Sequence, residues 1–282
     1  MTFRVKNHRL RAGSSNVKFV GSPNIGGELK PKFLVIHYTA SGPDADIARY
    51  FSQETANVSA HLVVRRDGSV TQCVPFNVVA WHAGKSQWTD KSGARFSGLN
   101  TDAIGIEIEN WGPINKAADG WISWTGAAVD GSKVIEARHK FGMPDCGWEV
   151  YTPAQLEAEV AAARAICAEY AIEDIVGHDD IAPGRKSDPG PAWDMEAFKA
   201  KVRGKAENGG AITVVRSSSG LNIRCGAGAS FALVRPTPLP DGTKVVSNEA
   251  SGVMCRFWRR TRSRIFPAGC METACLRGKE DR

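Results

Sequence analysis

Two histidines and an aspartate in this sequence are of the types that hold a catalytic zinc ion. His178 and Asp188 lie close together on a segment rich in proline and glycine, which can fold back on itself, whereas His37 comes from far upstream. Two imidazoles and one carboxylate would leave the fourth position of a tetrahedral site open for water, as catalytic zinc requires. The spacing alone does not establish a metal site, because a histidine is more often a hydrogen-bonded structural residue.

An apolar run indicates the strand that must carry His37. Residues 33–38 (FLVIHY) predict a short buried strand with His37 near its C-terminal end. Apolar side chains at helical spacing then predict a helix over residues 45–54, which Asp44 could cap. Loops at strand ends commonly build functional sites, so His37 is well placed to contribute to one.

A hairpin and an acidic strand are predicted next. The runs 61–65 and 70–74 are separated by an Asp-Gly pair, which supplies the positive φ angles of a tight turn. Residues 104–109 alternate between apolar and other side chains, so Glu107 and Glu109 should point to the same face of one strand. One face of this strand is therefore predicted to be acidic.

The last part of the larger domain begins with a strongly marked helix. Thr152 and Gln155 form a capping pair around a proline at the first helical position, and the helix is predicted to run to about Ala171. Residues 175–190 then predict a brief strand followed by a loop. Strands interleaved with helices indicate the α/β class, with helices flanking a mixed β-sheet.

The chain is predicted to contain two domains. With 282 residues, 42% of them hydrophobic, it is long and apolar enough for a large folded domain and a small one. A linker is predicted at residues 205–210 (KAENGG), between a domain at 1–204 and a small all-β domain at 211–282. The strand-like runs of the small domain lie around Val214, at Leu221–Arg224 and at Lys244–Val246.

Charge and cysteine usage narrow the class of protein. Residues 205–282 hold 13 Lys or Arg against 6 Asp or Glu, giving +7, whereas residues 1–204 hold 23 against 24. The positive segment could attract nucleic acid or the acidic polymers of a cell wall.

The seven cysteines include no CxxC pair, which argues against a disulfide framework or a thiolate zinc site. No apolar run suits a membrane helix or a signal peptide, so folding in the cytoplasm is expected.

Five motifs resemble the type 2 N-acetylmuramoyl-L-alanine amidases, a family that includes AmpD-like amidases and phage endolysin amidases and is related to peptidoglycan recognition proteins. They are VIHYTA (35–40), VSAHLVVRRDGSV (58–70), AWHAGKSQW (80–88), IGIEIEN (104–110) and GHDDIAPGRKSDPGPAW (177–193). They occur in the family's order, and the resemblance covers about residues 17–200. It implies a mixed sheet flanked by helices.

The resemblance also implies a catalytic machinery. One zinc ion per chain would be held by His37, His178 and Asp188, at the positions where the family carries its ligands. Zinc polarises the amide carbonyl and acidifies water, but a base must still take the proton, and Glu107 matches the family's glutamate. Lys186 matches a family lysine that could stabilise the negative charge developing on oxygen.

The remaining site residues are implied less directly. Asn110 resembles a family residue whose amide contacts the stem peptide of the muropeptide. His82 and His61 belong to motifs near the family's groove, so His82 could contact the substrate and His61 could orient other groups, or either could be structural. Trp81 and Trp88 could flank the groove, although buried aromatic residues are more often part of a core.

The small domain resembles the opening of bacterial SH3-like modules, which usually hold hydrolases on the cell wall. LNIRCGAG (221–228) and LPDGTKV (239–245) carry the resemblance, which covers about half of the module. It fails after Gly252, so an irregular, partly disordered basic tail is expected at 253–282. A metal site of the tail's three cysteines would lack a fourth ligand and metal-type spacing.

The predicted function is zinc-dependent hydrolysis of the amide between N-acetylmuramic acid and L-alanine. The substrate would be peptidoglycan or a muropeptide, and degradation of the wall is favoured over muropeptide recycling. A non-catalytic peptidoglycan-binding protein of the same fold is the alternative. Nucleic acid is an unlikely partner, although Phe257 and Trp258 lie among arginines in the tail.

Overall fold

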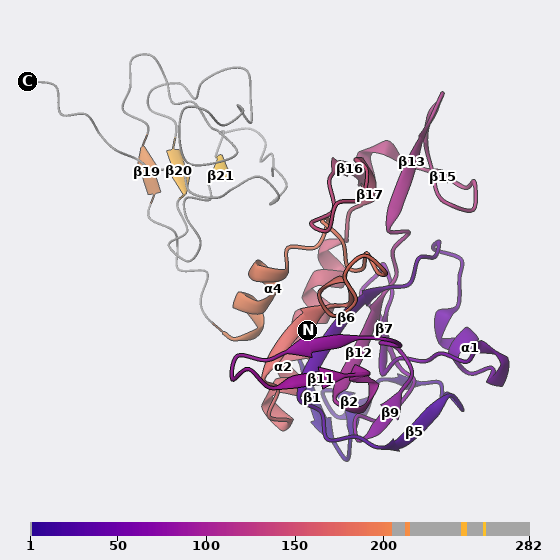
Figure 1. Cartoon of the computed structure of the whole chain (residues 1–282), viewed down its shortest axis with the longest axis vertical. Coiled ribbons are helices and arrows are strands. Elements are labelled where there is room, and N and C mark those ends of the chain that lie inside the picture. The colour runs from indigo at the N-terminus through magenta and orange to yellow at the C-terminus, as the bar shows by residue number, and fades with distance from the viewer. Residues whose placement is uncertain (1, 205–211, 215–243, 247–255, 258–282) are drawn as a thin grey trace, which may run out of the picture. The chain divides into compact units, whose positions relative to one another are not determined.

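The computed structural model describes residues 2–204, 212–214, 244–246 and 256–257. Contacts divide the chain into two units, residues 1–203 and 204–282 (Figure 1). The predicted linker at 205–210 lies outside the described residues. Among the helices of the described part, none combines the length and apolar character of a membrane span.

A six-stranded mixed sheet forms the centre of the first unit. In spatial order its strands are β18 (Asp174–Gly177), β6 (Phe33–Tyr38), β12 (Ala103–Ile108), β7 (Leu62–Val64), β8 (Val70–Gln72) and β4 (Lys18–Phe19). The first four are parallel, β7 and β8 form an antiparallel hairpin, and β4 pairs parallel to β8. The predicted strand over 33–38, the hairpin and the α/β class with a mixed sheet are confirmed.

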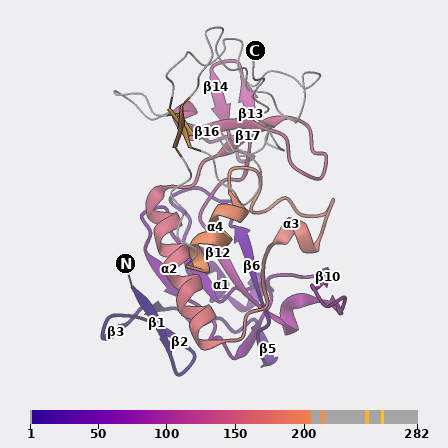
Figure 2. The same cartoon turned by 90° about the vertical axis from the view of Figure 1, so that its left-hand side faces the viewer.

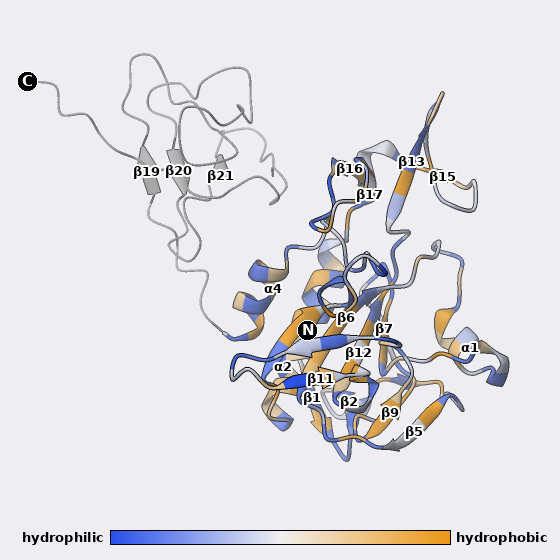
Figure 3. Cartoon of the chain, viewed as in Figure 1, coloured by the Kyte–Doolittle hydropathy of each residue, from blue (hydrophilic) through white to orange (hydrophobic). Residues whose placement is uncertain are grey.

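Two helices cover one face of this sheet. They are α2 (Pro153–Glu169) and α4 (Met195–Val202), which lie side by side in Figure 2. Leu34, Ile36 and Ile106 point toward them and form one core with Ala162 and Ile166 of α2. Figure 3 shows the apolar colouring of these central elements. Burial of this face fixes the register of β6 and β12, because a slip by one residue would invert every side chain.

The first turn of α2 begins as predicted. The Thr152 hydroxyl accepts a hydrogen bond from the backbone N–H of Gln155, and the Gln155 side chain accepts one from the backbone N–H of Thr152. The helix ends at Glu169, two residues before the expected end.

The opposite face of the sheet carries the polar side chains. Phe33 and Val35 pack into a second core, and His37 follows them on the same face because strand side chains alternate. In the parallel register of β6 and β12, Glu107 is the partner of His37. The sheet therefore places an imidazole and a carboxylate next to each other.

Short elements surround the sheet. They are β1 (Phe3–Lys6), β2 (Arg9–Ala12), β3 (Ser15–Asn16), β5 (Ile25–Glu28), α1 (Ile47–Phe51), η1 (Glu54–Ala56), β9 (Val78–Ala80), β10 (Gln87–Thr89), β11 (Arg95–Ser97), η2 (Leu99–Thr101) and α3 (His178–Ile181). Asp46, and not Asp44 as predicted, caps α1, because its carboxylate accepts a hydrogen bond from the Arg49 N–H. The short helices α3 and α4 were not predicted.

An additional β-sheet lies in sequence between β12 and α2. It consists of β13 (Pro113–Ala117), β14 (Gly120–Ile122), β15 (Ala128–Val129), β16 (Val134–Ala137) and β17 (Cys146–Glu149), with η3 (Gly131–Lys133). We call residues 113–149 the β-insert. Its order is β15-β14-β13-β17-β16, and all of its pairings are antiparallel.

In the second unit three short strands are described. β19 (Ile212–Val214), β20 (Lys244–Val246) and β21 (Arg256–Phe257) pair antiparallel in that order. The first two agree with predicted strands, and the predicted run 221–224 lies outside the described residues. β21 falls within 253–282, where an irregular tail was expected, and this short strand corrects that expectation for residues 256–257.

Candidate active site

Three ligand-type atoms converge on one point in the first unit. The Nδ1 atom of His37 lies 2.9 Å from Nδ1 of His178 and 2.9 Å from Oδ2 of Asp188. Nδ1 of His178 is also 2.9 Å from that carboxylate oxygen. His37 comes from the end of β6, His178 starts α3 after β18, and Asp188 ends the loop that follows. All three residues are buried, and of the described residues they are the group that could hold a metal ion.

Hydrogen bonds fix which ring nitrogen of His178 is protonated. Its Nε2 lies 3.2 Å from the backbone oxygen of Ala83, which can only accept, so Nε2 carries the proton and donates it. In the tautomer that carries its proton on Nε2, Nδ1 of His178 has a free lone pair. It faces Asp188, so two electron-rich atoms meet here.

Two further hydrogen bonds, which we call the His82 relay, fix the tautomer of His37. The Nε2 atom of His82 lies 3.2 Å from the backbone oxygen of Ala103 and so donates to it, which leaves His82 Nδ1 as an acceptor. His37 Nε2 lies 3.0 Å from that Nδ1 and therefore carries its own proton. Nδ1 of His37 is left unprotonated toward Asp188.

The environment of His37 keeps its ring neutral. Burial, followed by the repulsion of His178, lowers the pKa of His37 to about 4, although Asp188 opposes the shift. Two unprotonated nitrogens and a carboxylate oxygen at hydrogen-bond separation have no proton between them, so this donor set suits a cation. Ring N–H groups bound to carbonyls or polar neighbours are the usual outer support of metal-ligating histidines.

Glu107 lies on the same face as the three ligand-type residues. Its Oε2 atom is buried and has no hydrogen-bond partner among the described residues. Burial, and then the charge of Asp188, raise the pKa of Glu107 well above its ordinary value, although Lys186 lowers it. An orphaned buried carboxylate oxygen is uncommon and suits a group that exchanges protons with a ligand.

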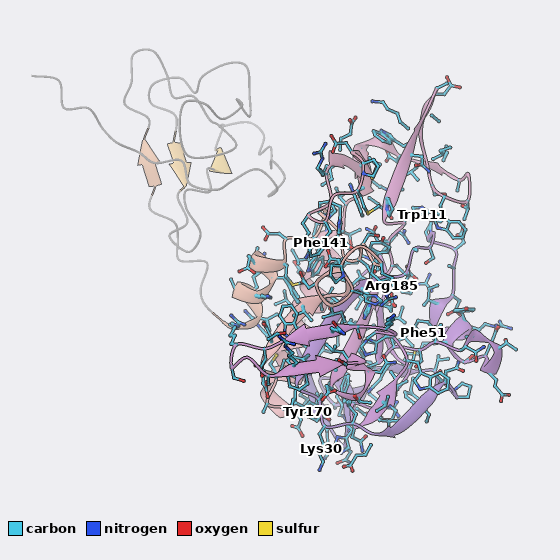
Figure 4. All side chains as sticks on the ribbon, in the orientation of Figure 1. Lys30, Phe51, Trp111, Phe141, Tyr170 and Arg185 are labelled. Atoms are coloured by element: carbon cyan, nitrogen blue, oxygen red, sulfur yellow. The ribbon has the colours of Figure 1, made fainter. Side chains whose placement is uncertain are left out.

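A cleft of about 390 Å³ opens over these groups. Asp188, His178, His82, Glu107 and Lys186 line it, together with aromatic and apolar side chains of which Tyr50, Val58 and Trp81 are exposed. Figure 4 labels Phe51 and Arg185, two other residues of the lining. Of the eight residues predicted for the site, six line the cleft or hold the convergent atoms. These are His37, His82, Glu107, His178, Lys186 and Asp188.

Asn110 and His61 lie elsewhere. The amide of Asn110 is fully buried, donates to the backbone oxygen of Glu149 and accepts from the Gly112 N–H. His61 donates to the Val78 oxygen and accepts from the Gly105 N–H, so its ring joins backbone segments. Neither residue lines the cleft, and their predicted substrate roles remain predictions.

Two pairs of residues that were predicted to act together lie apart in the structure. Glu109 does not share a cluster with Glu107, because it follows the end of β12 and pairs with Arg65 and Arg66. Trp81 lines the cleft, whereas Trp88 packs against the second core.

Arg185 was given no role from the sequence, yet its guanidinium donates to the backbone oxygens of Ala83 and Lys85. It therefore secures the loop whose carbonyl orients His178. The sequence Gly-Arg-Lys at 184–186 predicts a charged loop, but it does not indicate which groups the arginine contacts.

The sequence is similar to those of known amidases. The family described as N-acetylmuramoyl-L-alanine amidase matches residues 27–191. The 1,6-anhydro-N-acetylmuramyl-L-alanine amidase AmpD of Salmonella typhimurium is 32% identical over 192 residues, covering 61% of this chain and 81% of the relative. The N-acetylmuramoyl-L-alanine amidase AmiD of Escherichia coli is 37% identical over 171 residues, but the match spans only half of its length.

The chain is also similar to solved structures of such proteins. A selenomethionine derivative of AmpD aligns over 66% of this chain and 94% of its own, with 28% identity and a TM-score of 0.43. AmiD from E. coli, solved with anhydro-N-acetylmuramic acid-L-Ala-D-γ-Glu-L-Lys, aligns over 71% and 65%, with 29% identity and a TM-score of 0.44. Because the family match extends over more than half of the chain, the chain belongs to the N-acetylmuramoyl-L-alanine amidases and is an enzyme of that class.

Proposed function

We propose that this enzyme depends on zinc and hydrolyses the amide between the lactyl group of N-acetylmuramic acid and L-alanine in peptidoglycan. The observation that carries the proposal is the triangle of acceptor atoms formed by His37, His178 and Asp188, each pair 2.9 Å apart. With no proton available between them, the three atoms fit a divalent cation. Two nitrogens and one oxygen are a donor set that zinc accepts in catalytic sites.

The protein groups around the cleft would divide the chemistry. A bound zinc ion would supply Lewis acidity, which polarises the amide carbonyl and acidifies water. Glu107 would accept the proton of the attacking water through its unpartnered Oε2 and pass it to the leaving amine of L-alanine, as the C–N bond breaks. The ammonium group of Lys186 would stabilise the negative charge on the carbonyl oxygen.

His82 would act through His37. Its ring accepts from His37 Nε2 and donates to Ala103, so it holds the first ligand in one tautomer and one orientation. His82 also lines the cleft, where it would contact the substrate.

Intact wall is proposed as the preferred substrate over soluble muropeptides. Support comes from the net charge of +7 on residues 205–282 and from their resemblance to wall-binding modules. AmpD relatives carry 1,6-anhydro-N-acetylmuramyl substrates in their names, and AmiD was solved with such a muropeptide, so soluble substrates should also be accepted.

Metal content and turnover measured together test the proposal. We expect His178→Ala and Asp188→Ala to lose bound zinc and activity. Glu107→Gln should retain zinc, measured by atomic emission, while kcat on a soluble muropeptide falls by about 10²–10⁴. Glu136→Gln, which changes an exposed carboxylate paired with Lys116, is the control and should change neither. A parent enzyme that is fully active without metal would refute zinc dependence.

A further inference from the structure

Exposed apolar side chains are concentrated around the cleft. In the described part of the chain seven large hydrophobic residues are exposed, namely Phe19, Ile25, Tyr50, Val58, Trp81, Trp124 and Phe141. Tyr50, Val58 and Trp81 line the cleft. Because soluble proteins seldom gather exposed apolar groups at one place without a ligand for them, this grouping suggests a binding surface.

Trp124 extends this surface from the β-insert. Its side chain is 67% exposed, the highest value among these residues, yet it is held in place. The indole N–H donates to the backbone oxygen of Ala40 at 2.8 Å, and Ala40 lines the cleft. The polar edge of the indole is thus anchored at the cleft rim, whereas most of the ring remains open to solvent.

The rim that Trp124 contacts is itself fixed. Gly42 lies so close to Trp111 that an added Cβ would come within 2.4 Å of the indole ring. The backbone N–H of Ser41 donates to the backbone oxygen of Asn110. The loop after β6 is therefore packed against the residues that join β12 to the β-insert, so the carbonyl that holds Trp124 is itself held in place.

The cleft has an apolar side and a positively charged side. Most of its aromatic and apolar lining comes from the segments around α1 and Trp81, with Tyr38 at the end of β6, whereas its cations, Arg185 and Lys186, come from the loop before Asp188. The apolar C–H face of a pyranose ring stacks on an exposed aromatic ring, and the carboxylates of a stem peptide suit cations. The aromatic side therefore fits sugar, and the cationic side fits peptide.

We propose that Trp124, with Tyr50 and Trp81, binds the glycan strand beyond the muramic acid whose amide is cut. This inference rests on the proposed function and makes the enzyme selective for glycan length. Stacking on one ring should favour a substrate of three disaccharide units over one of a single unit by about tenfold in kcat/KM.

Soluble muropeptides of one and three disaccharide units test this on the full chain. Trp124→Ala should raise KM for the longer substrate about tenfold, leave kcat/KM for the shorter one within twofold, and retain zinc. Trp124→Phe, which keeps a ring but loses the bond to Ala40, should be intermediate. Phe141→Ala removes an exposed aromatic residue of the β-insert that does not line the cleft, and should have no effect.

We call Trp124, Tyr50 and Trp81 the glycan surface. Three results would refute its role: Trp124→Ala lowers kcat/KM equally for both substrates, it lowers kcat/KM for neither, or the parent shows no preference for the longer substrate. If the parent hydrolyses neither substrate, the proposed function is wrong. The glycan surface can then still be tested by measuring the binding of peptide-free glycan strands to the parent and to Trp124→Ala. Retained binding that Trp124→Ala weakens about tenfold would support the surface. Equal binding by parent and variant would end it.

Discussion

At the scale of single residues, the site depends on a glycine. Gly105 lies on β12 directly beneath His82, and a Cβ at this position would come within 2.4 Å of the imidazole ring. Only a residue without a side chain lets His82 occupy the place from which it orients His37. The glycine of the IGIEIEN motif is therefore needed to place His82, and through it His37, as well as to build the strand.

Gly105→Ala should consequently displace His82. We expect a loss of about 1–3 kcal/mol in the free energy of unfolding, from overpacking, and roughly tenfold weaker zinc binding in a chelator competition. Gly27→Ala is a suitable control, because a Cβ there would meet nothing within 4 Å. Unchanged zinc affinity in Gly105→Ala would show that the His82 relay does not support the metal site.

Glu159 is a buried carboxylate that the proposed chemistry does not use. Both of its side-chain oxygens lack hydrogen-bond partners among the described residues, and burial raises its pKa to about 8. Between about pH 4.5 and pH 8 the unfolded chain releases this proton while the folded chain retains it. The contribution of Glu159 to stability is therefore complete at low pH and is lost as the pH rises toward 8.

Glu159→Gln should remove this pH dependence. The free energy of unfolding of the variant minus that of the parent should grow by roughly 2–4 kcal/mol between pH 4.5 and pH 8.5, and then level off. Urea unfolding across this range measures the difference, and Glu157→Gln on the exposed side of α2 is the control. A constant difference would mean that water or a partner already satisfies Glu159.

Sequence reasoning identified the residue types of the site better than their contacts. His37, His178 and Asp188 could be named because zinc ligands are chemically few and the motifs carry them. The amide of Asn110 could not be seen to bond the backbone of Gly112 and residue 149, because such pairings arise from the tertiary fold. The same limit hid the anchoring of Trp124.

At the scale of elements, the β-insert supports the loop that carries two of the ligands. His139 follows β16, is buried, and its Nε2 lies 3.0 Å from Oδ2 of Asp179, while Lys140 pairs with Asp179 and Asp180. The backbone N–H of Asp179 donates to the backbone oxygen of Asp188. An element outside the central sheet thus braces the segment between His178 and Asp188.

His139→Ala should leave Asp179 buried with one fewer partner. We expect a loss of about 2–4 kcal/mol in the free energy of unfolding and about tenfold weaker zinc retention. Arg138→Ala, next to it, removes only an exposed ion pair with Asp145 and should cost less than about 0.5 kcal/mol. A His139→Ala enzyme that is destabilised but binds zinc as the parent does would show that the insert only adds stability.

Long and strongly patterned elements were the predictable ones. The strand over 33–38 and α2 follow from an apolar run and a capping box, both of which are local signals. The β-insert was not predicted, because its strands are only two to five residues long and most of their residues are not fully buried, so they depend on pairing with one another. The helix α3 has four residues and begins at a ligand, so it has no periodic pattern to read.

At the scale of the whole molecule, the first unit contains its own folding determinants. All three clusters of core residues among the described part of the chain lie between Phe3 and Val202. The convergent ligands and the cleft also belong to this range. Residues 1–204 should therefore fold and hydrolyse soluble substrate without the remainder, whose all-β, SH3-like character stays a prediction.

A chain ending at residue 204 should separate catalysis from retention on the wall. It loses 13 of the 36 basic residues and changes from a net charge of +6 to −1. We expect kcat/KM for a soluble muropeptide to remain within about twofold, while co-sedimentation with purified sacculi weakens and loses most of its salt dependence. Measurement at ~50 mM and ~300 mM salt distinguishes electrostatic retention from specific binding, because the Debye length shrinks over this range. Equal retention of the two chains at both salt concentrations would place wall affinity in the cleft and the glycan surface around Trp124.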